Sequence, residues 1–552
     1  MDQYDLGAFT RPVTATGPEA QLWFDRGLNW LYGFNHGEAI TCFKRALEHD
    51  PTCAMAHWGI AYAAGPNYNL PWHLYDERGR AKALAEAYDA TAEATRHATA
   101  ATPVEQALIA ALAARYPQRV PADGMDAWDR AFTAAMRSAF HAHRDDREVR
   151  AVFVEAIMNE TPWRMWDLDT GRPAEGAGTL EAMATLDEAF ATDPLAWSHP
   201  GLLHLHVHLM EMSPFPERAL RTGDRLRTLA PDLGHLVHMP THIDVLCGHY
   251  AEVLHWNQEA IRADRRYMAD RGMKNVYTLY RVHDYHFAIY GAMFLGQFTP
   301  AMAAAEELIA TTPEEMLRVE SPPMADFLEA FIAMKQHVLV RFGRWEDIVA
   351  QREPDDRALY CSTVSIMRYA KAVAHSALGN IAEAEAARTA FYEAKAAQQD
   401  SRLVHNNTVT DLLQVAEAML EGELEYRKGN YDTAFAHLRE AVRREDALPY
   451  DEPWGWMQPT RHALGALLFE QGRMQEAEAV FRADLGLDGT LRRACVHPEN
   501  VWALRGLHDC LVARDEGVEI VHIRQRLTLA EARAEVPVKA PCFCAQRAMA
   551  AQ

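Results

Sequence analysis

A spacing of small and large apolar residues recurs along this chain and constrains its fold more than any other sequence feature. It is present in full twice, at Ala39, Phe43, Ala46 and Pro51 and at Ala182, Leu186, Ala189 and Pro194. A second signature joins a glycine to an apolar or aromatic residue and then a small residue, and it starts at Gly296, Gly379, Gly429 and Gly472. Repeats of this kind predict pairs of antiparallel helices.

The rest of the chain is consistent with helices. Apolar residues recur at intervals of three and four residues, and alternating runs of β-branched residues are nearly absent. This periodicity is typical of amphipathic helices. We therefore predict an all-α fold class.

The segment that follows the repeat pattern most fully resembles the tetratricopeptide repeat family, through Trp23, Gly27, Trp30, Ala39, Phe43, Ala46 and Pro51. The resemblance implies a right-handed superhelical solenoid of helical hairpins with a concave groove. It covers most of residues 1–552, without an internal domain boundary. Residues 66–147 and 162–178 fit poorly and are expected to be irregular or inserted. Residues 518–535 are expected to form a capping helix, and residues 536–552 a Cys-X-Cys tail.

Composition limits the partners and the location that we expect. The 552 residues carry 77 acidic and 55 basic side chains, for a formal net charge of −22. Such a surface repels phosphate backbones, so we expect no nucleic acid partner. Neither a secretory signal nor an apolar run of the roughly 20 residues that a membrane span needs is found, so we expect a cytoplasmic protein without a membrane partner.

The cysteines do not indicate a disulfide framework. The sequence contains eight cysteines, scattered except for Cys542 and Cys544. These two lie in a proline-flanked tail, and their spacing is too short for a zinc-ribbon hook. We expect an exposed, inert tail, with a redox or metal-capturing role as the alternative.

Histidines are concentrated in the middle third of the chain, where eleven of the 26 fall between positions 199 and 286. Aligning three successive units on their glycine and proline positions brings seven of them to equivalent places on the first helix. These are His204, His208, His235, His238, His242, His283 and His286. In the tetratricopeptide family such positions line the groove, so the resemblance implies that these imidazoles share one strip of it.

This pattern predicts a metal site. Residues three or four apart on a helix are neighbours, so His204 with His208 and His238 with His242 can each offer two nitrogens to one ion. Together with His286, these four are the direct ligands that we expect first. Imidazole-rich sites suit zinc, copper, iron or nickel. The Met239–Pro240 break is expected to bend the helix between His235 and His242.

A closer resemblance is to a set of histidine-rich tetratricopeptide proteins of unassigned function. They share segments that read here His204-Leu-His-Val-His208, His235-Leu-Val-His-Met-Pro-Thr-His242 and His283-Asp-Tyr-His286. Because no activity is established for that set, the resemblance implies a shared site and not a named reaction.

Other candidate residues come from the surrounding sequence. Glu155, Glu160 and Glu211 are candidates for a catalytic acid or base. An apolar substrate pocket is predicted from His57, Trp163, Trp166, Tyr280 and Tyr290, although His57 falls at a packing position of its repeat. No phosphate loop, dinucleotide-binding glycine motif or nucleophile elbow is present.

Three functions remain open. The favoured hypothesis is a metalloenzyme in which copper or iron oxidises a small aromatic or amino-acid-like molecule in the groove. The second is a zinc-dependent hydrolase that uses one of the three glutamates as its base. The third is a scaffold that binds a peptide, a partner protein or a second copy of the chain.

Overall fold

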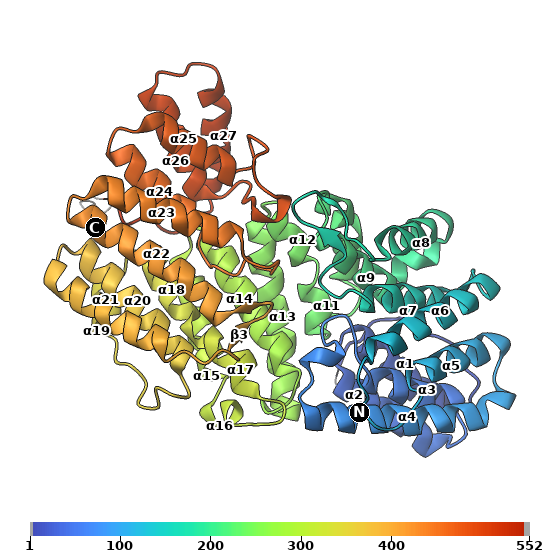
Figure 1. The fold of residues 1–552 in the computed structure, drawn as a ribbon. Coiled ribbons are helices and arrows are strands. Elements are labelled where there is room, and N and C mark those ends of the chain that lie inside the picture. Colours follow the sequence, from blue (N-terminus) through green and yellow to red (C-terminus); the bar gives the residue numbers. More distant parts are fainter. Residues whose placement is uncertain (1–3, 546–552) are drawn as a thin grey trace. The chain divides into compact units, whose positions relative to one another are not determined.

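The computed structural model describes residues 4–545, and these are overwhelmingly helical, which confirms the all-α prediction (Figure 1). Strands in the described residues are confined to two short antiparallel hairpins. One pairs β1 (Trp166–Asp167) with β2 (Arg172–Pro173), and the other pairs β3 (Leu403–Val404) with β4 (Asn407–Thr408).

The chain divides into two compact units, where the sequence predicted no boundary. Unit 1 comprises Met1–Ile243 and Glu259–Arg281, and unit 2 comprises Asp244–Gln258 and Val282–Gln552. Three helices contribute residues to both units: α12 (Thr241–Leu246), α13 (Tyr250–Arg271) and α14 (Thr278–Leu295).

The remaining helices of unit 1 run from α1 to α11. They are α1 (Pro18–Tyr32), α2 (His36–His49), α3 (Ala54–Ala64), α4 (Glu77–His97), α5 (Pro103–Arg115), α6 (Asp126–Ala142), α7 (Arg147–Asn159), α8 (Thr179–Thr192), α9 (Pro200–Glu211), α10 (Leu220–Leu226) and α11 (Gly234–His238). Short 3-10 turns are η1 (Trp72–Leu74), η2 (Ala98–Ala100), η3 (Pro194–Ser198) and η4 (Pro216–Ala219).

The remaining helices of unit 2 run from α15 to α27. They are α15 (Phe298–Ala310), α16 (Glu314–Leu317), α17 (Met324–Leu328), α18 (Met334–Arg341), α19 (Trp345–Ala350), α20 (Cys361–Ala377), α21 (Ile381–Ala396), α22 (Val409–Arg427), α23 (Tyr431–Asp446), α24 (Thr460–Glu470), α25 (Met474–Asp484), α26 (Val501–Ala513) and α27 (Glu519–Glu531). The 3-10 turns η5 (Glu329–Ala333) and η6 (Arg493–Cys495) complete the unit.

The predicted hairpin turns are present. Gly296, Gly379, Gly429 and Gly472 each adopt a positive φ, between 71° and 84°, directly before or close to the start of the next helix. Only glycine takes this conformation without a steric penalty, and it is common just after a helix. Sequential helices such as α20 with α21 and α22 with α23 consequently pack as antiparallel pairs (Figure 1).

A large aromatic side chain between two glycines joins neighbouring hairpins. A Cβ at Gly27 of α1 would lie 2.6 Å from the Phe43 ring of α2, and one at Gly59 of α3 would lie 2.7 Å from it. In unit 2, Phe481 of α25 takes the same place between glycines of α24 and α26. The repeated Gly and Phe positions therefore reflect close helix packing, as in tetratricopeptide-like hairpins.

The stretches that fit the repeat pattern poorly differ from one another. Residues 66–147 contain three regular helices, α4 to α6, which lack the repeat signature but pack in the same sequential way. Residues 162–178 are instead a loop built around the β1–β2 hairpin. Helix α27 occupies most of the expected capping segment.

Candidate metal centre

Helix α9 presents two imidazoles on one buried face. Pro200 begins the helix, where its missing N–H costs nothing, and the His199 ring caps it by accepting a hydrogen bond from the Leu202 amide at 3.2 Å. His204 and His208 follow one turn apart, with ring centroids 4.7 Å from each other.

The break after α11 orients a second pair of imidazoles. Helix α11 ends at His238 because Pro240 cannot continue it, and α12 starts at Thr241. The Thr241 hydroxyl donates to the His238 carbonyl at 2.7 Å, and the Nε2 atoms of His238 and His242 lie 2.8 Å apart. The bend expected at Met239–Pro240 is therefore present, and it keeps His238 and His242 in contact.

Imidazoles of α9 and α11 meet in the interior of unit 1. One ring nitrogen from each of His204, His208 and His235 lies within 4.8 Å of the other two. The side chains are at most 1% exposed. Among the described residues, Nε2 of His204, Nε2 of His208 and both ring nitrogens of His235 have no hydrogen-bond partner. Leaving such an atom buried and unsatisfied costs about 1–3 kcal/mol, so the grouping is unfavourable unless something else binds it.

Hydrogen-bond acceptors lie at Nδ1 of His204, His208 and His242. His204 Nδ1 lies 2.8 Å from the Tyr32 carbonyl oxygen. The two Glu211 carboxylate oxygens lie 3.0 Å from His208 Nδ1 and 2.9 Å from His242 Nδ1. Because a carbonyl oxygen only accepts, His204 Nδ1 carries the hydrogen and its Nε2 presents a lone pair. Where Glu211 accepts from both rings as a carboxylate, the same holds for His208 and His242. Metal-binding histidines are usually supported in this way.

Burial keeps these rings uncharged. Desolvation lowers the pKa of His204 from 6.5 to about 3, and it lowers the pKa values of His208 and His235 well below 6.5, with neighbouring histidines adding to the effect. Neutral imidazole is the form that binds a metal ion. The three rings are thus in the ligating state before any ion arrives.

This state predicts a weak pH dependence of metal affinity in unit 1. When the pH falls from about 7.5 to about 5.5, the neutral fraction of an ordinary histidine with a pKa of ~6.5 falls roughly tenfold. A site with three such histidines would therefore bind metal about a thousandfold more weakly at the lower pH. With His204 titrating only near pH 3, we expect less than about a tenfold change. Competition with a chelator of known pH dependence measures it, and a thousandfold loss with the fold intact by circular dichroism contradicts the expectation.

Aromatic side chains surround the three histidines. The Phe34 ring stacks on His208 at 5.8 Å and on His235 at 5.3 Å. Trp163 lies edge-on to His208 at 5.9 Å. Phe34 and Trp163 adopt φ values of 53° and 57°, a left-handed conformation that is strained for a bulky residue and is concentrated at functional sites. Tyr280 lies against His235 at 4.7 Å.

The three candidate glutamates occupy different environments. Glu211 contacts Nδ1 of His208, one of the three clustered rings, and Nδ1 of His242, which favours a positioning role over that of a base. Glu155 accepts a hydrogen bond from the Tyr62 hydroxyl at 2.5 Å, and burial raises its pKa. Glu160 is partly exposed just after α7.

The remaining pocket candidates are dispersed. The indole Nε1 of Trp166 donates to the Leu209 carbonyl at 2.7 Å. His57 is half-buried, 3.1 Å from the Pro51 carbonyl, and stacks on His97. Tyr290 belongs to unit 2, where it stacks on Phe294. Of the predicted pocket residues, Trp163 and Tyr280 contact the clustered histidines of unit 1.

The last two predicted ligands, His283 and His286, belong to unit 2. There, one nitrogen from each lies within 4.8 Å of the other and of a nitrogen of His405. Sequence analysis did not select His405 because it lies outside the histidine-rich third. Its neighbours Val404 and Asn406 give no histidine spacing that marks it. That all seven predicted histidines share one ion stays a prediction.

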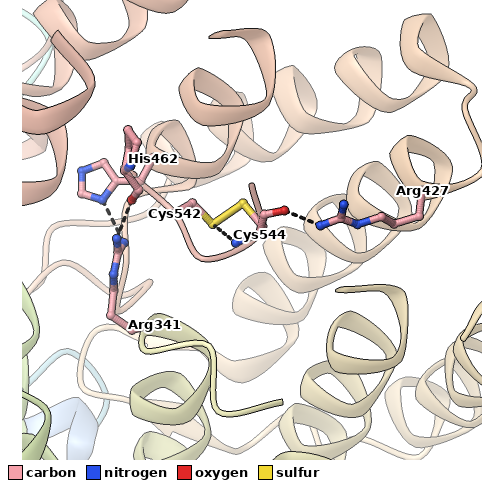
Figure 2. Close-up of a disulfide and its surroundings, with 6 residues drawn as sticks. Arg341, Arg427, His462, Cys542 and Cys544 are labelled. Atoms are coloured by element: carbon pink, nitrogen blue, oxygen red, sulfur yellow. Dashed lines mark hydrogen bonds between the residues drawn. A yellow bond between two sulfur atoms is a disulfide. The ribbon is translucent and has the colours of Figure 1, made fainter. Parts of the chain in front are cut away.

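The Cys-X-Cys segment is not the exposed tail that the sequence suggested. Cys542 and Cys544 form a disulfide (Figure 2), and Cys544 is only 1% exposed. Arg341 donates to the Pro541 carbonyl at 2.6 Å, and Arg427 donates to the Cys544 carbonyl. Two arginines, one on α18 and one on α22, therefore hold the backbone of this segment within unit 2. Residues 546–552 of the predicted tail lie outside the described residues.

Comparisons with known proteins add little on function. No family model and no curated protein matches the chain. Solved structures that match include the human IFIT1 dimer with PPP-AAAA (11% identity, TM-score 0.29, covering 91% of this chain and 89% of that one). Another is Naa15/Naa10 bound to HypK-THB (13% identity, TM-score 0.21, covering 93% and 71%). At such low sequence identities and TM-scores, similarity to these structures says nothing about what this chain binds. Within the described residues, no helix is both long and apolar enough to cross a membrane.

Proposed function

We propose that unit 1 binds a transition metal ion through Nε2 of His204, Nε2 of His208 and a ring nitrogen of His235. One observation carries the proposal: each of three buried imidazoles places a ring nitrogen within 4.8 Å of the other two, and each has a ring nitrogen without a hydrogen-bond partner among the described residues. Lone pairs gathered in this way repel one another, and a cation resolves the repulsion. Imidazole ligands favour zinc, copper, iron or nickel over magnesium or calcium.

The surroundings support a site that is organised in advance. The Tyr32 carbonyl holds His204, and Glu211 holds His208 and His242. His242 presents a lone pair on Nε2, so His238 Nε2 donates to it at 2.8 Å. This pair lies beside the proposed ligands, with the ring centroids of His235 and His238 5.9 Å apart. Either ring could become a fourth ligand only by breaking the hydrogen bond that joins His238 to His242.

We further propose that the centre is catalytic and that its metal is redox-active. Three protein ligands leave positions open for a small molecule, which is typical of catalytic metal sites. Phe34, Tyr68 and Trp163 provide an aromatic surface beside His208, suited to an aromatic or amino-acid-like substrate. The Glu211 carboxylate is already bound to Nδ1 of His208 and of His242, which disfavours a zinc hydrolase with Glu211 as its base. Copper or iron, reacting with dioxygen, is the favoured choice.

Metal titration of the untagged, chelator-treated protein tests the binding proposal. We expect His204→Ala with His208→Ala to lose one bound equivalent of copper, iron or zinc, as measured by calorimetry. His141→Ala, which removes an exposed histidine of α6, is the matched control and should keep that equivalent. A double variant that binds metal as the wild type does overturns the proposal.

Metal binding should also stabilise unit 1. At a free metal concentration of 100 times Kd, linkage gives about 2.7 kcal/mol, or a melting shift of roughly 5 °C for a unit of this size. Scanning calorimetry of wild type and the double variant, with and without metal, measures the difference. Electron paramagnetic resonance and oxygen uptake then separate a redox metal from zinc, which gives neither signal.

A further inference from the structure

Unit 2 brings four metal-binding side chains from three separate segments to one place. His283 and His286 lie three residues apart on α14, with ring centroids 6.2 Å apart. The His405 ring lies 4.2 Å from that of His283 and 5.7 Å from that of His286. The fourth member is a thioether, because Met457 Sδ lies 2.8 Å from His286 Nε2.

His405 reaches this place through an unusual turn. It follows β3 and precedes Asn406 and β4, in a two-residue hairpin turn, and has a φ of 47°. Turns of this length need left-handed residues, and histidine is among the residues other than glycine that adopt this conformation more often. The turn therefore accommodates His405 between the two strands.

The hairpin is fastened to the segment that carries Met457. The Asn406 side chain donates to the Tyr450 carbonyl at 3.1 Å, and the Asn407 side chain donates to Asp451 at 2.9 Å. Trp454 anchors the same segment to the Glu445 carbonyl at 3.0 Å. These hydrogen bonds therefore hold the β3–β4 hairpin, which carries His405, against the segment that carries Met457.

The environment of the four side chains distinguishes them from the centre in unit 1. Met457 and His286 are fully buried, whereas His283 and His405 are only partly buried. The Phe331 ring packs against His286 at 5.2 Å and against His405 at 4.8 Å. The group thus combines imidazole with thioether sulfur, an apolar wall and partial solvent access.

We propose that His283, His286, His405 and Met457 form a second metal site, in unit 2, which binds monovalent copper. Thioether sulfur is a soft ligand that selects copper(I) over zinc, magnesium or calcium, and imidazole is compatible with it. The proposal does not depend on the function proposed for unit 1, whose ligands contain no sulfur.

Titration with copper(I) under anaerobic, reducing conditions, against a colorimetric copper(I) chelator, tests this site in the full chain. Met457→Leu keeps the volume of the side chain and should lower the affinity for one equivalent of copper(I) by at least tenfold. His405→Asn suits the left-handed turn and should lower the copper(I) affinity by a similar factor without loss of stability. His522→Ala, on the exposed face of α27, is the control.

X-ray absorption supplies an independent readout. The copper(I) form of wild type should show a sulfur scatterer, which Met457→Leu removes. His235→Phe, which alters only unit 1, should keep it, so that failure of one site is distinguishable from failure of the other. The proposal is overturned if Met457→Leu and His405→Asn bind copper(I) as wild type does, or if no sulfur lies at the copper.

Discussion

Replacing His235 with phenylalanine should abolish metal binding in unit 1 and leave the metal-free protein as stable as wild type, or more so. Both ring nitrogens of His235 are buried without a hydrogen-bond partner among the described residues, and the pKa of its ring is held well below 6.5. Removing an unsatisfied buried polar group gains about 1–3 kcal/mol, while phenylalanine fills a similar volume. A residue that serves only the fold would show the opposite result.

His206 offers a matched comparison for this prediction. It is another buried histidine of α9, but its Nδ1 lies 2.8 Å from the Thr222 hydroxyl. His206→Phe should lose about 1 kcal/mol or more of stability and retain metal. Urea unfolding of the metal-free proteins, together with metal titration, measures both variants. If His235→Phe is as destabilised as His206→Phe and still binds metal, His235 is not a ligand.

Glu211→Gln should weaken metal binding by about 10–100-fold. The carboxylate accepts hydrogen bonds from both His208 and His242, whereas an amide offers only one accepting oxygen. One of the two rings must then turn or face an N–H group. Because the effect acts through ring orientation, we also expect a changed visible or paramagnetic spectrum of the bound metal at saturation.

Glu155→Gln is the control for that substitution. Glu155 is also buried, with a raised pKa, but its partner is the Tyr62 hydroxyl. Its replacement should leave metal affinity and spectrum unchanged. An equal loss in both variants would show that Glu211 acts on general stability and not on the ligands.

Local sequence could predict the fold and select the three clustered histidines of unit 1, His204, His208 and His235. Turn glycines such as Gly296 and packing residues such as Phe43 act within one hairpin, so their spacing is visible in the chain. The pairs on α9 and around α11 follow the same helical spacing. Helices α4 to α6 carry no such signature, and their regularity was therefore missed.

The supporting residues could not be predicted because they depend on contacts distant in sequence. The Tyr32 carbonyl is 172 positions from His204, and the Phe34 ring comes from the turn after α1. In unit 2, Met457 is 171 positions from His286. The hydrogen bond to the Cys544 carbonyl likewise comes from Arg427, 117 positions away. Such pairings leave no local periodicity in the sequence.

The most direct measurement is anomalous diffraction from crystals of the metal-loaded protein, recorded above and below the absorption edge of the bound metal. The account predicts a peak at about 2.0–2.1 Å from Nε2 of His204, Nε2 of His208 and a ring nitrogen of His235, as zinc or a similar ion bound to imidazole requires. Absence of a peak at these atoms under saturating metal, with the three rings ordered, would contradict it.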